Sequence, residues 1–273
     1  MLDAIEPGRL APALSAEDYH ADPALGNSGL GLIERSIAHL LREVRPSEDS
    51  PALLVGSALH CAVLEPDAYH ERYAAAPEVD RRTKEGKATW AEFVEQAEGR
   101  TVLTSAQSET IEDMSDALRE HPTASRLLAG GAVELSAFWD MSGIACKCRP
   151  DHVSADGRVL ADLKTTQDAS PEAFAKSCAN FAYHRQAAWY TRGWEAVTGL
   201  RADFVFVTVE KAPPYGVACY TLDAAALAEG WLRAQESVAK YRRFLATPAA
   251  ERCAGYDPKI RELALPRWAF RAD

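Results

Sequence analysis

Apolar residues recur at helical spacing through the first half of the chain. An Asn-Ser pair at 27–28, a typical helix N-cap, precedes a stripe that begins at Leu30 and runs to Leu41. Residues 1–26 are rich in Ala, Pro and Gly and show little periodicity, so they are predicted to form an irregular arm. Further helices are predicted over residues 51–64, 84–98 and 105–120.

After Gly130-Gly131 the pattern changes to alternation of apolar and polar residues, which is typical of strands. Three alternating segments separated by turn residues predict an antiparallel meander over 132–140, 144–153 and 158–166. A helix with Gln186 and Tyr190 follows. The last elements expected are a strand over 203–210, a strand over 217–222 and a helix over 223–245.

This order of elements predicts an α/β fold, with a mixed central β-sheet flanked by helices and an N-terminal helical region. Neither a Pro/Gly linker nor an internal repeat divides residues 1–273, so a single domain is expected. Its expected parts are the irregular arm (1–26), a mainly helical region (27–129), the catalytic α/β core (130–250) and a C-terminal tail (251–273).

The turns of the meander predict which strand residues oppose each other. A two-residue turn at Asp156-Gly157, a pair that suits type I′ geometry, places Asp151 opposite Asp162. A turn at Ser142-Gly143 places Glu134 opposite Asp151. Directly opposed residues have Cβ atoms about 5 Å apart, so these three carboxylates are predicted to form a row across three strands.

Basic residues share the face of this carboxylate row, because residues two apart on a strand point the same way. Lys164 follows Asp162 at that spacing, and Arg149 and Lys147 precede Asp151. A solvated sheet face with mixed charges is one interpretation. The other is a cation site, since opposed carboxylates repel each other unless a cation neutralises them.

A hard divalent cation would explain the carboxylate row. Mg²⁺ typically takes one or two carboxylates and keeps several waters, and Mn²⁺ is a possible substitute. Beside such a site, Lys164 can stabilise charge developing on a phosphate or orient the attacking water. These groups are the equipment of metal-assisted phosphodiester hydrolysis.

Charge and cysteine content limit the possible compartments and partners. The net charge of −10, taken over the whole chain, argues against a nucleic-acid partner. Binding depends on where the charge lies, however, and basic residues cluster at Arg81-Arg82, Lys147–Arg149 and Arg242-Arg243. Six scattered cysteines, with no basic-then-apolar leader, predict a reduced cytoplasmic protein without disulfides. The Cys146-x-Cys148 pair lacks the partners of a zinc set. No uncharged apolar run predicts a membrane span.

The chemistry-bearing residues resemble the motifs of a known superfamily. Asp151 followed by Asp162-Leu163-Lys164 resembles the D…(D/E)-x-K signature of the PD-(D/E)XK nucleases. The segment Gly56–His60 resembles the G-x-x-x-H motif of the RecB-like branch, and Gln186-x-x-x-Tyr190 resembles its Q-x-x-x-Y helix.

The two ends of the chain narrow the resemblance. Residues 19–23 and 28–30, and the ending at 263–269, are similar to the RecE-type exodeoxyribonuclease VIII nuclease domain, so the likeness covers nearly the whole chain in order. It implies a Mg²⁺-dependent 5′→3′ exonuclease that degrades linear double-stranded DNA to 3′ single-stranded ends for recombination, often encoded by phage. A homo-oligomeric ring and a single-strand annealing protein partner are also implied. No iron–sulphur cluster is implied, since Cys253 stands alone.

The resemblance assigns roles residue by residue. It implies that His60, Asp151 and Asp162 bind metal, that Lys164 is the catalytic lysine and that Glu134 is a helper acid. Gln186 and Tyr190 would orient the lysine or contact the DNA backbone.

Each of these further roles has a structural alternative. His60 can be a core histidine, and Gln186 and Tyr190 can form a structural hydrogen bond. Arg35, Ser36 and Arg149 are candidate DNA-binding residues, the first two for a 5′ phosphate, although an ordinary surface arginine remains an alternative for Arg35.

Other functions remain open beside the exonuclease. The same fold serves endonucleases of restriction or repair type and non-catalytic DNA-binding proteins. Comparing cleavage of linear DNA with cleavage of covalently closed DNA distinguishes the exonuclease from the endonuclease.

Overall fold

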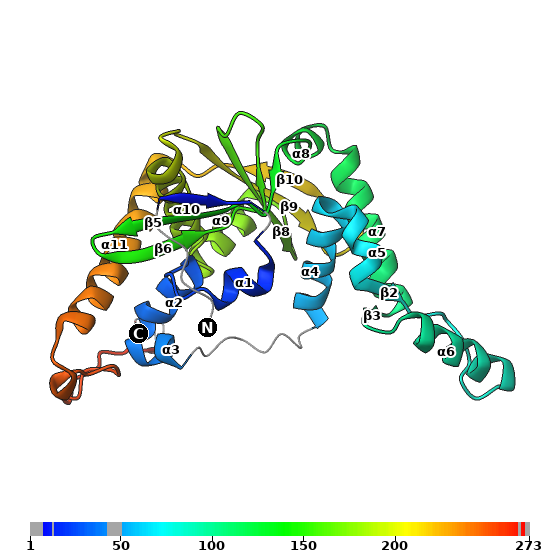
Figure 1. The fold of residues 1–273 in the computed structure, drawn as a ribbon, viewed down its shortest axis with the longest axis horizontal. Helices are drawn as coiled ribbons and strands as arrows, with labels where there is room; N and C mark the ends of the chain where they lie inside the picture. Colours follow the sequence, from blue (N-terminus) through cyan, green and yellow to red (C-terminus); the bar gives the residue numbers. More distant parts are fainter. Residues whose placement is uncertain (1–7, 13, 43–50, 267–268, 271–273) are drawn as a thin grey trace.

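A computed structural model describes residues 8–12, 14–42, 51–266 and 269–270, in which helices flank a central mixed sheet (Figure 1). This five-stranded sheet has the order β10-β9-β8-β7-β4, and only the β8–β9 pair is parallel. The predicted α/β architecture with a mixed sheet is therefore confirmed. In chain order the strands are β4 (Ala132–Val133), β7 (His152–Val153), β8 (Val159–Thr166), β9 (Asp203–Glu210) and β10 (Val217–Tyr220).

The predicted meander is divided between two sheets. Its strands β5 (Ser136–Met141) and β6 (Ile144–Cys148) leave the central sheet and form a three-stranded sheet with β1 (Arg9–Ala11). The chain crosses between the sheets near Glu134, where the backbone has a φ of 53°. It crosses back at residues 149–151. The predicted carboxylate row therefore lies at a bend between two sheets.

Both predicted registers are confirmed despite this division. His152 pairs with Ala161 across the second hairpin, the alignment that places Asp151 opposite Asp162. Ala137 pairs with Cys148, and Val133 pairs with His152. The same alignment therefore holds on both sides of the bend, because each tight turn fixes the pairs that follow it.

The two long parallel strands are buried on both faces, as is usual where crossover helices cover a sheet. Between them run α9 (Pro171–Asn180) and α10 (Tyr183–Thr198), and α11 (Ala224–Ala246) packs beside α10. On this side Leu160 joins one hydrophobic cluster. On the other side Leu163 packs in a second cluster with residues of α4 (Pro51–Leu64) and α7 (Ser105–Glu120).

The predicted irregular arm is wrong for the described part of residues 1–26. This segment contains β1, which pairs with β5, and a helix, α1 (Ala16–Ala21). Tyr19 and Ala11 pack against Phe138 of β5. Sequence periodicity missed these elements because a three-residue strand and a six-residue helix depend on tertiary partners rather than on their own pattern.

The helix expected after residues 27–28 forms, but its cap differs. It is α2 (Asn27–Arg35), and Gly26 rather than Asn27 occupies the N-cap position. The Asn27 side chain is used elsewhere, because its Oδ1 accepts a hydrogen bond from Arg185 Nε at 3.0 Å. A short helix, α3 (Ile37–Leu41), follows.

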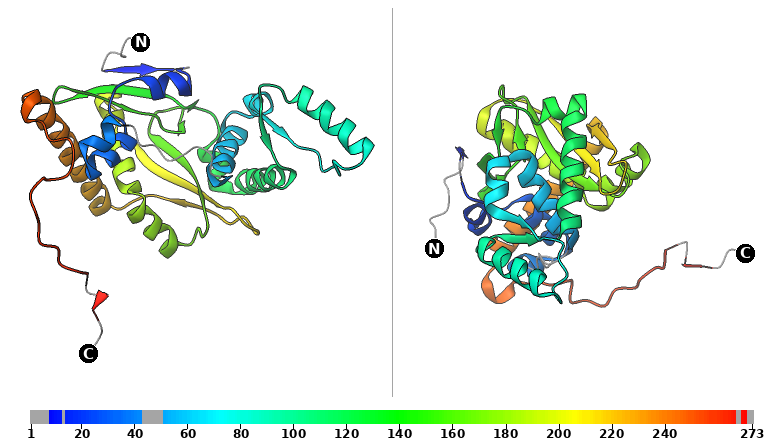
Figure 2. Two further views of the ribbon diagram at one scale, coloured as in Figure 1. Left: turned by 90° about the horizontal axis from the view of Figure 1, so that it is seen from below. Right: turned by 90° about the vertical axis from the view of Figure 1, so that its right-hand side faces the viewer.

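The helices expected over 51–64 and 105–120 are confirmed with those bounds, and the one expected over 84–98 ends at Gln96. Figure 1 shows this last helix, α6, projecting far from the sheets. Figure 2 shows residues 252–266 leaving the body as an extended segment. No helix in the described ranges is long and apolar enough to cross a membrane. The remaining elements are α5 (Pro66–Arg72), β2 (Tyr73–Ala75), α6 (Lys84–Gln96), β3 (Thr101–Leu103), α8 (Pro122–Leu127) and a 3-10 helix (Ala249–Glu251).

Candidate active site

His60 connects helix α4 to the end of strand β8. Its Nε2 lies 2.7 Å from the carbonyl oxygen of Leu163. Because a carbonyl can only accept, Nε2 must carry a proton and donate it. In the neutral ring Nδ1 then carries a lone pair, and this atom lies 3.5 Å from Asp151 Oδ2. Two electron-rich atoms therefore face each other, which requires a proton or a cation nearby.

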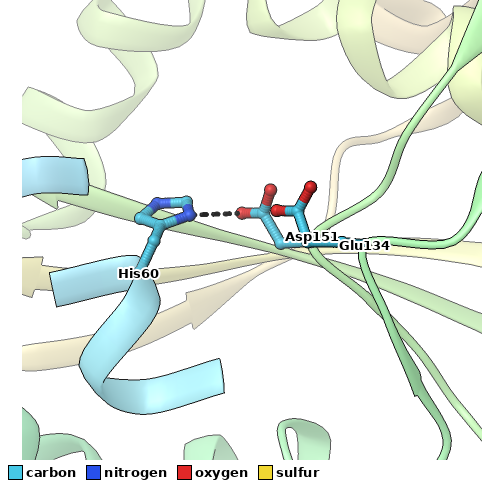
Figure 3. Close-up of side chains that lie close together, drawn as sticks. All are labelled: His60, Glu134 and Asp151. Carbon is cyan, nitrogen blue, oxygen red and sulfur yellow. Dashed lines mark ion pairs between the residues drawn. The ribbon is translucent and has the colours of Figure 1, made fainter. Parts of the chain in front are cut away.

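Asp151 is held at the bend by backbone hydrogen bonds. Its Oδ2 accepts from the Leu163 N–H at 2.7 Å, and its carbonyl accepts from the Glu134 N–H at 3.0 Å. One ligand atom each from His60, Glu134 and Asp151 lies within 4.8 Å of the other two. Figure 3 shows the three side chains converging on one region from helix α4 and from the two crossings between the sheets.

The electrostatics of this cluster favour a cation. Burial, and then the negative charge of Asp151, raise the pKa of the Glu134 carboxyl to about 7. Arg149 opposes this shift, with its Nε 2.5 Å from Glu134 Oε2. Two neighbouring carboxylates repel each other, and a cation between them would relieve that repulsion.

The donor set fits a divalent metal ion. Carboxylate oxygens suit Mg²⁺ and Mn²⁺, and an imidazole can complete such a set. A metal-binding histidine commonly donates its other ring N–H to a backbone carbonyl, which is the arrangement of His60 with Leu163. His60, Glu134 and Asp151 are therefore the residues that would hold the ion.

Asp162 lies on the same strand as Lys164 and is almost completely buried. Its Oδ1 accepts a hydrogen bond from Gln186 Nε2 at 2.5 Å, and its Oδ2 forms an ion pair with Lys164 Nζ. Burial and the nearby Asp151 charge raise the pKa of Asp162, whereas Lys164 opposes that shift.

Lys164 keeps its charge in this setting. Burial by itself would lower the pKa of the ammonium, but attraction by Asp162 and Asp151 outweighs it and raises that pKa. The Nζ atom also lies 5.1 Å from the centre of the Tyr183 ring, at a distance typical of cation–π contacts. The lysine is thus a fixed positive charge beside the acidic cluster.

These positions differ in part from the roles expected from the sequence. Glu134, expected as a helper acid, lies in the candidate metal cluster. Asp162, expected as a ligand, lies outside that cluster, where it accepts a hydrogen bond from Gln186 and pairs with Lys164. Tyr190 packs edge-on against Phe204, with ring centres 5.8 Å apart, and Tyr183 takes the place beside the lysine.

Ser36, a candidate for binding a 5′ phosphate, has a buried side chain in this structure. Its hydroxyl lies 2.6 Å from His39 Nδ1. Arg35 is exposed on α2 but does not line the cleft beside Lys164. The spacing of residues along the sequence did not indicate whether the Ser36 hydroxyl points into the protein or toward solvent.

Arg149 has a further role that the sequence did not indicate. Besides Glu134, its guanidinium donates to the carbonyl oxygens of Leu14 at 3.0 Å and Ser15 at 3.1 Å. These contacts hold the segment before α1 against the site. The sequence could not indicate these two hydrogen bonds, because a backbone carbonyl accepts a hydrogen bond whatever its residue type.

A cleft of about 1130 Å³ opens beside these groups. This volume exceeds the usual range of about 300–1,000 Å³ for small-molecule sites, which favours a larger ligand. The walls come from α4, the end of β8, the start of α10 and the segment before α1. Site residues at its surface include His60, Glu134, Arg149, Lys164, Tyr183 and Lys211.

The fold is that of the PD-(D/E)XK superfamily. The family described as "PDDEXK-like domain of unknown function (DUF3799)" matches residues 33–256, and the chain belongs to this family. No curated protein matches the sequence.

One solved structure supports the same fold. This structure, from Eubacterium rectale and described as a "Putative exonuclease", is 15% identical, with 85% of this chain and 86% of that chain covered and a TM-score of 0.59. A second, SSO0001, is 14% identical over 68% of this chain and 86% of that chain, but its TM-score of 0.29 is too low to bear on the fold.

The cluster generates a prediction about metal binding. Asp151→Asn and Glu134→Gln should each weaken Mn²⁺ binding at least about tenfold, because each removes a charged ligand. Isothermal titration calorimetry of the DNA-free protein measures the affinity. Asp162→Asn distinguishes the two ligand sets, since it should have a smaller effect if Asp162 serves Lys164 rather than the metal.

Glu65→Gln provides the matched control. Glu65 also lines the cleft, but it pairs with Arg72 and lies outside the cluster. Its substitution should leave the affinity within about twofold of the original. Unchanged affinity in both Asp151→Asn and Glu134→Gln would show that these carboxylates are not ligands.

Proposed function

We propose that the protein is a Mg²⁺-dependent 5′→3′ exonuclease, which degrades linear double-stranded DNA and leaves 3′ single-stranded ends for recombination. The observation that carries the proposal is the charged Lys164 fixed between Asp162 and Tyr183, next to a second cluster of metal-ligand type. A purely structural sheet face has no need of a half-buried lysine beside several acids.

The residues divide the work of phosphodiester hydrolysis. A divalent ion held by His60, Glu134 and Asp151 would neutralise phosphate charge and activate water. Lys164 donates hydrogen bonds to the phosphate as negative charge builds up in the transition state. Asp162 keeps the lysine charged and aimed, and Gln186 fixes the Asp162 carboxylate.

The exonuclease mode and the DNA substrate come from the motif resemblance, which covers nearly the whole chain in order. The structural neighbour from Eubacterium rectale, described as a "Putative exonuclease", is consistent with this mode. A 3′ single-stranded product is the substrate of a single-strand annealing protein, and we propose that class as the partner.

Lys164→Ala should reduce cleavage by at least about 100-fold, because the lysine acts on the transition state. Circular dichroism and Mn²⁺ titration should show an unchanged fold and nearly unchanged metal affinity. Lys211→Ala is the control, since Lys211 lines the same cleft without joining the acids. Near-normal cleavage by folded Lys164→Ala protein would remove the assigned role.

The mode of attack is tested with end-labelled DNA in Mg²⁺ and in EDTA. A linear duplex should lose its 5′ label first, the complementary strand should remain intact, and closed circles and EDTA samples should be spared. Cleavage should also weaken as salt rises, because phosphates supply the attraction. Nicking of closed circles would identify an endonuclease, and binding without any cleavage would identify a DNA-binding protein.

We further propose that the protein forms a closed homo-oligomeric ring. A chain with a net charge of −10 can hold DNA only by concentrating its basic residues, and a ring points one basic surface of each copy inward. Light scattering should therefore give the mass of a trimer or tetramer. A monomer at working concentrations would contradict the ring while leaving the cleavage results unaffected.

A further inference from the structure

Residues 76–100 form a projection that stands away from both sheets. Its main element is α6, a helix of 13 residues and so about 20 Å long, which Figures 1 and 2 show extending beyond the rest of the body. The two strands at its base, β2 and β3, pair in parallel and bring its ends together. Among the described residues, none from 76 to 100 belongs to a hydrophobic cluster. Core packing therefore does not explain the projection.

The tip of the projection carries four exposed cations within seven residues: Arg81, Arg82, Lys84 and Lys87. None of them forms an ion pair with another residue in the described ranges, unlike Arg72, Arg149 and Arg185 in the body. Asp80 and Glu85 lie among them and Glu78 lies just before, whereas the other acids of the projection, Glu92, Glu95 and Glu98, follow farther along α6 and just after it. In a chain with a net charge of −10, such a concentration of free positive charge is available to an external anion.

The tip is a defined turn rather than a loose loop. Thr83 caps α6 by accepting from the Gly86 N–H at 2.9 Å, and Asp80 Oδ1 accepts from the Arg82 N–H at 2.9 Å. Gly86 allows the turn to pack closely, since a Cβ there would lie 2.1 Å from the Asp80 carbonyl oxygen. The Arg81 guanidinium lies 4.2 Å from the centre of the Trp90 ring. The cations are therefore presented in a fixed arrangement at little further cost in conformational entropy.

The projection begins at the rim of the candidate active-site cleft. Arg72 and Tyr73 line the cleft, and Tyr73 is also the first residue of β2. A long, stiff polyanion lying in the cleft can therefore extend past this rim toward the projection. Duplex DNA has this shape, and it carries a phosphate about every 3.4 Å along each strand.

We propose that the basic tip of the projection, formed by Arg81, Arg82, Lys84 and Lys87, binds the phosphate backbone of duplex DNA outside the cleft. This inference rests on the proposed function and adds a second DNA contact to it. The tip holds the part of the duplex that has not yet been degraded, whereas the cleft holds the end. Phosphate contacts of this kind fix position without reading sequence.

The test is a triple variant, Arg82→Gln, Lys84→Gln and Lys87→Gln, which keeps Arg81 on Trp90. Its affinity for a fluorescent blunt-ended duplex of about 30 base pairs is measured by anisotropy in EDTA, over a series of salt concentrations. If each lost cation contacts one phosphate, the slope of log K against log salt should become less steep by about 2.7, and affinity at low salt should fall at least about tenfold.

The matched control is Arg126→Gln, Arg158→Gln and Arg242→Gln, three residues that form no ion pair within the described part of the chain. It removes three exposed cations that do not line the cleft. The change in net charge is the same, so a general electrostatic effect would weaken both triple variants equally. Circular dichroism checks that both remain folded.

The outcomes separate this inference from the proposed function. A loss of slope and affinity confined to the projection variant supports the second contact. Equal behaviour of the two triple variants, with DNA cleavage by the unmodified protein, overturns the projection proposal alone. An unmodified protein that neither binds nor cleaves duplex DNA overturns both.

Discussion

The carboxylate of Asp151 is the point on which the site depends. It accepts the N–H of Leu163 from β8, faces the His60 ring from α4 and lies beside Glu134 at the crossing between sheets. A buried carboxylate needs such partners, because removing its charge from water is costly. The partners of Asp151 come from both crossings between the sheets and from helix α4, so these three segments meet at one position.

Like charges in a buried space also explain how the groups divide into two sets. Glu134 and Asp151 converge with His60, whereas Asp162 turns toward Lys164 and Gln186. Each set has a different way to offset its negative charge. The first has only Arg149 and so suits an added cation, while the second contains its own ammonium group. The site therefore joins metal-type ligands to a permanent positive charge.

The cleft is shaped by segments far apart in the sequence. Arg149 ties the segment before α1 to Glu134 through the carbonyl oxygens of Leu14 and Ser15. On another wall, α4 leads through α5 to β2 and the projection with its basic tip. Both walls are thus anchored to the acidic cluster, which lets one duplex place its end at the cluster and its undegraded part at the tip of the projection.

The sequence by itself determined the class of fold, both hairpin registers and the position of Lys164 beside Asp162. Those features depend on local rules: turn residues fix cross-strand pairs, and residues two apart share a face. Tertiary structure alone decided that Glu134 joins His60 and Asp151, that Tyr183 rather than Tyr190 lies beside the lysine, and that Ser36 is buried. A positive φ at Glu134 bends the chain between two sheets, and helix packing selects which side chains face inward. The bend at Glu134 and the inward-facing side of each helix do not follow from spacing along the chain, because residues distant in sequence determine them.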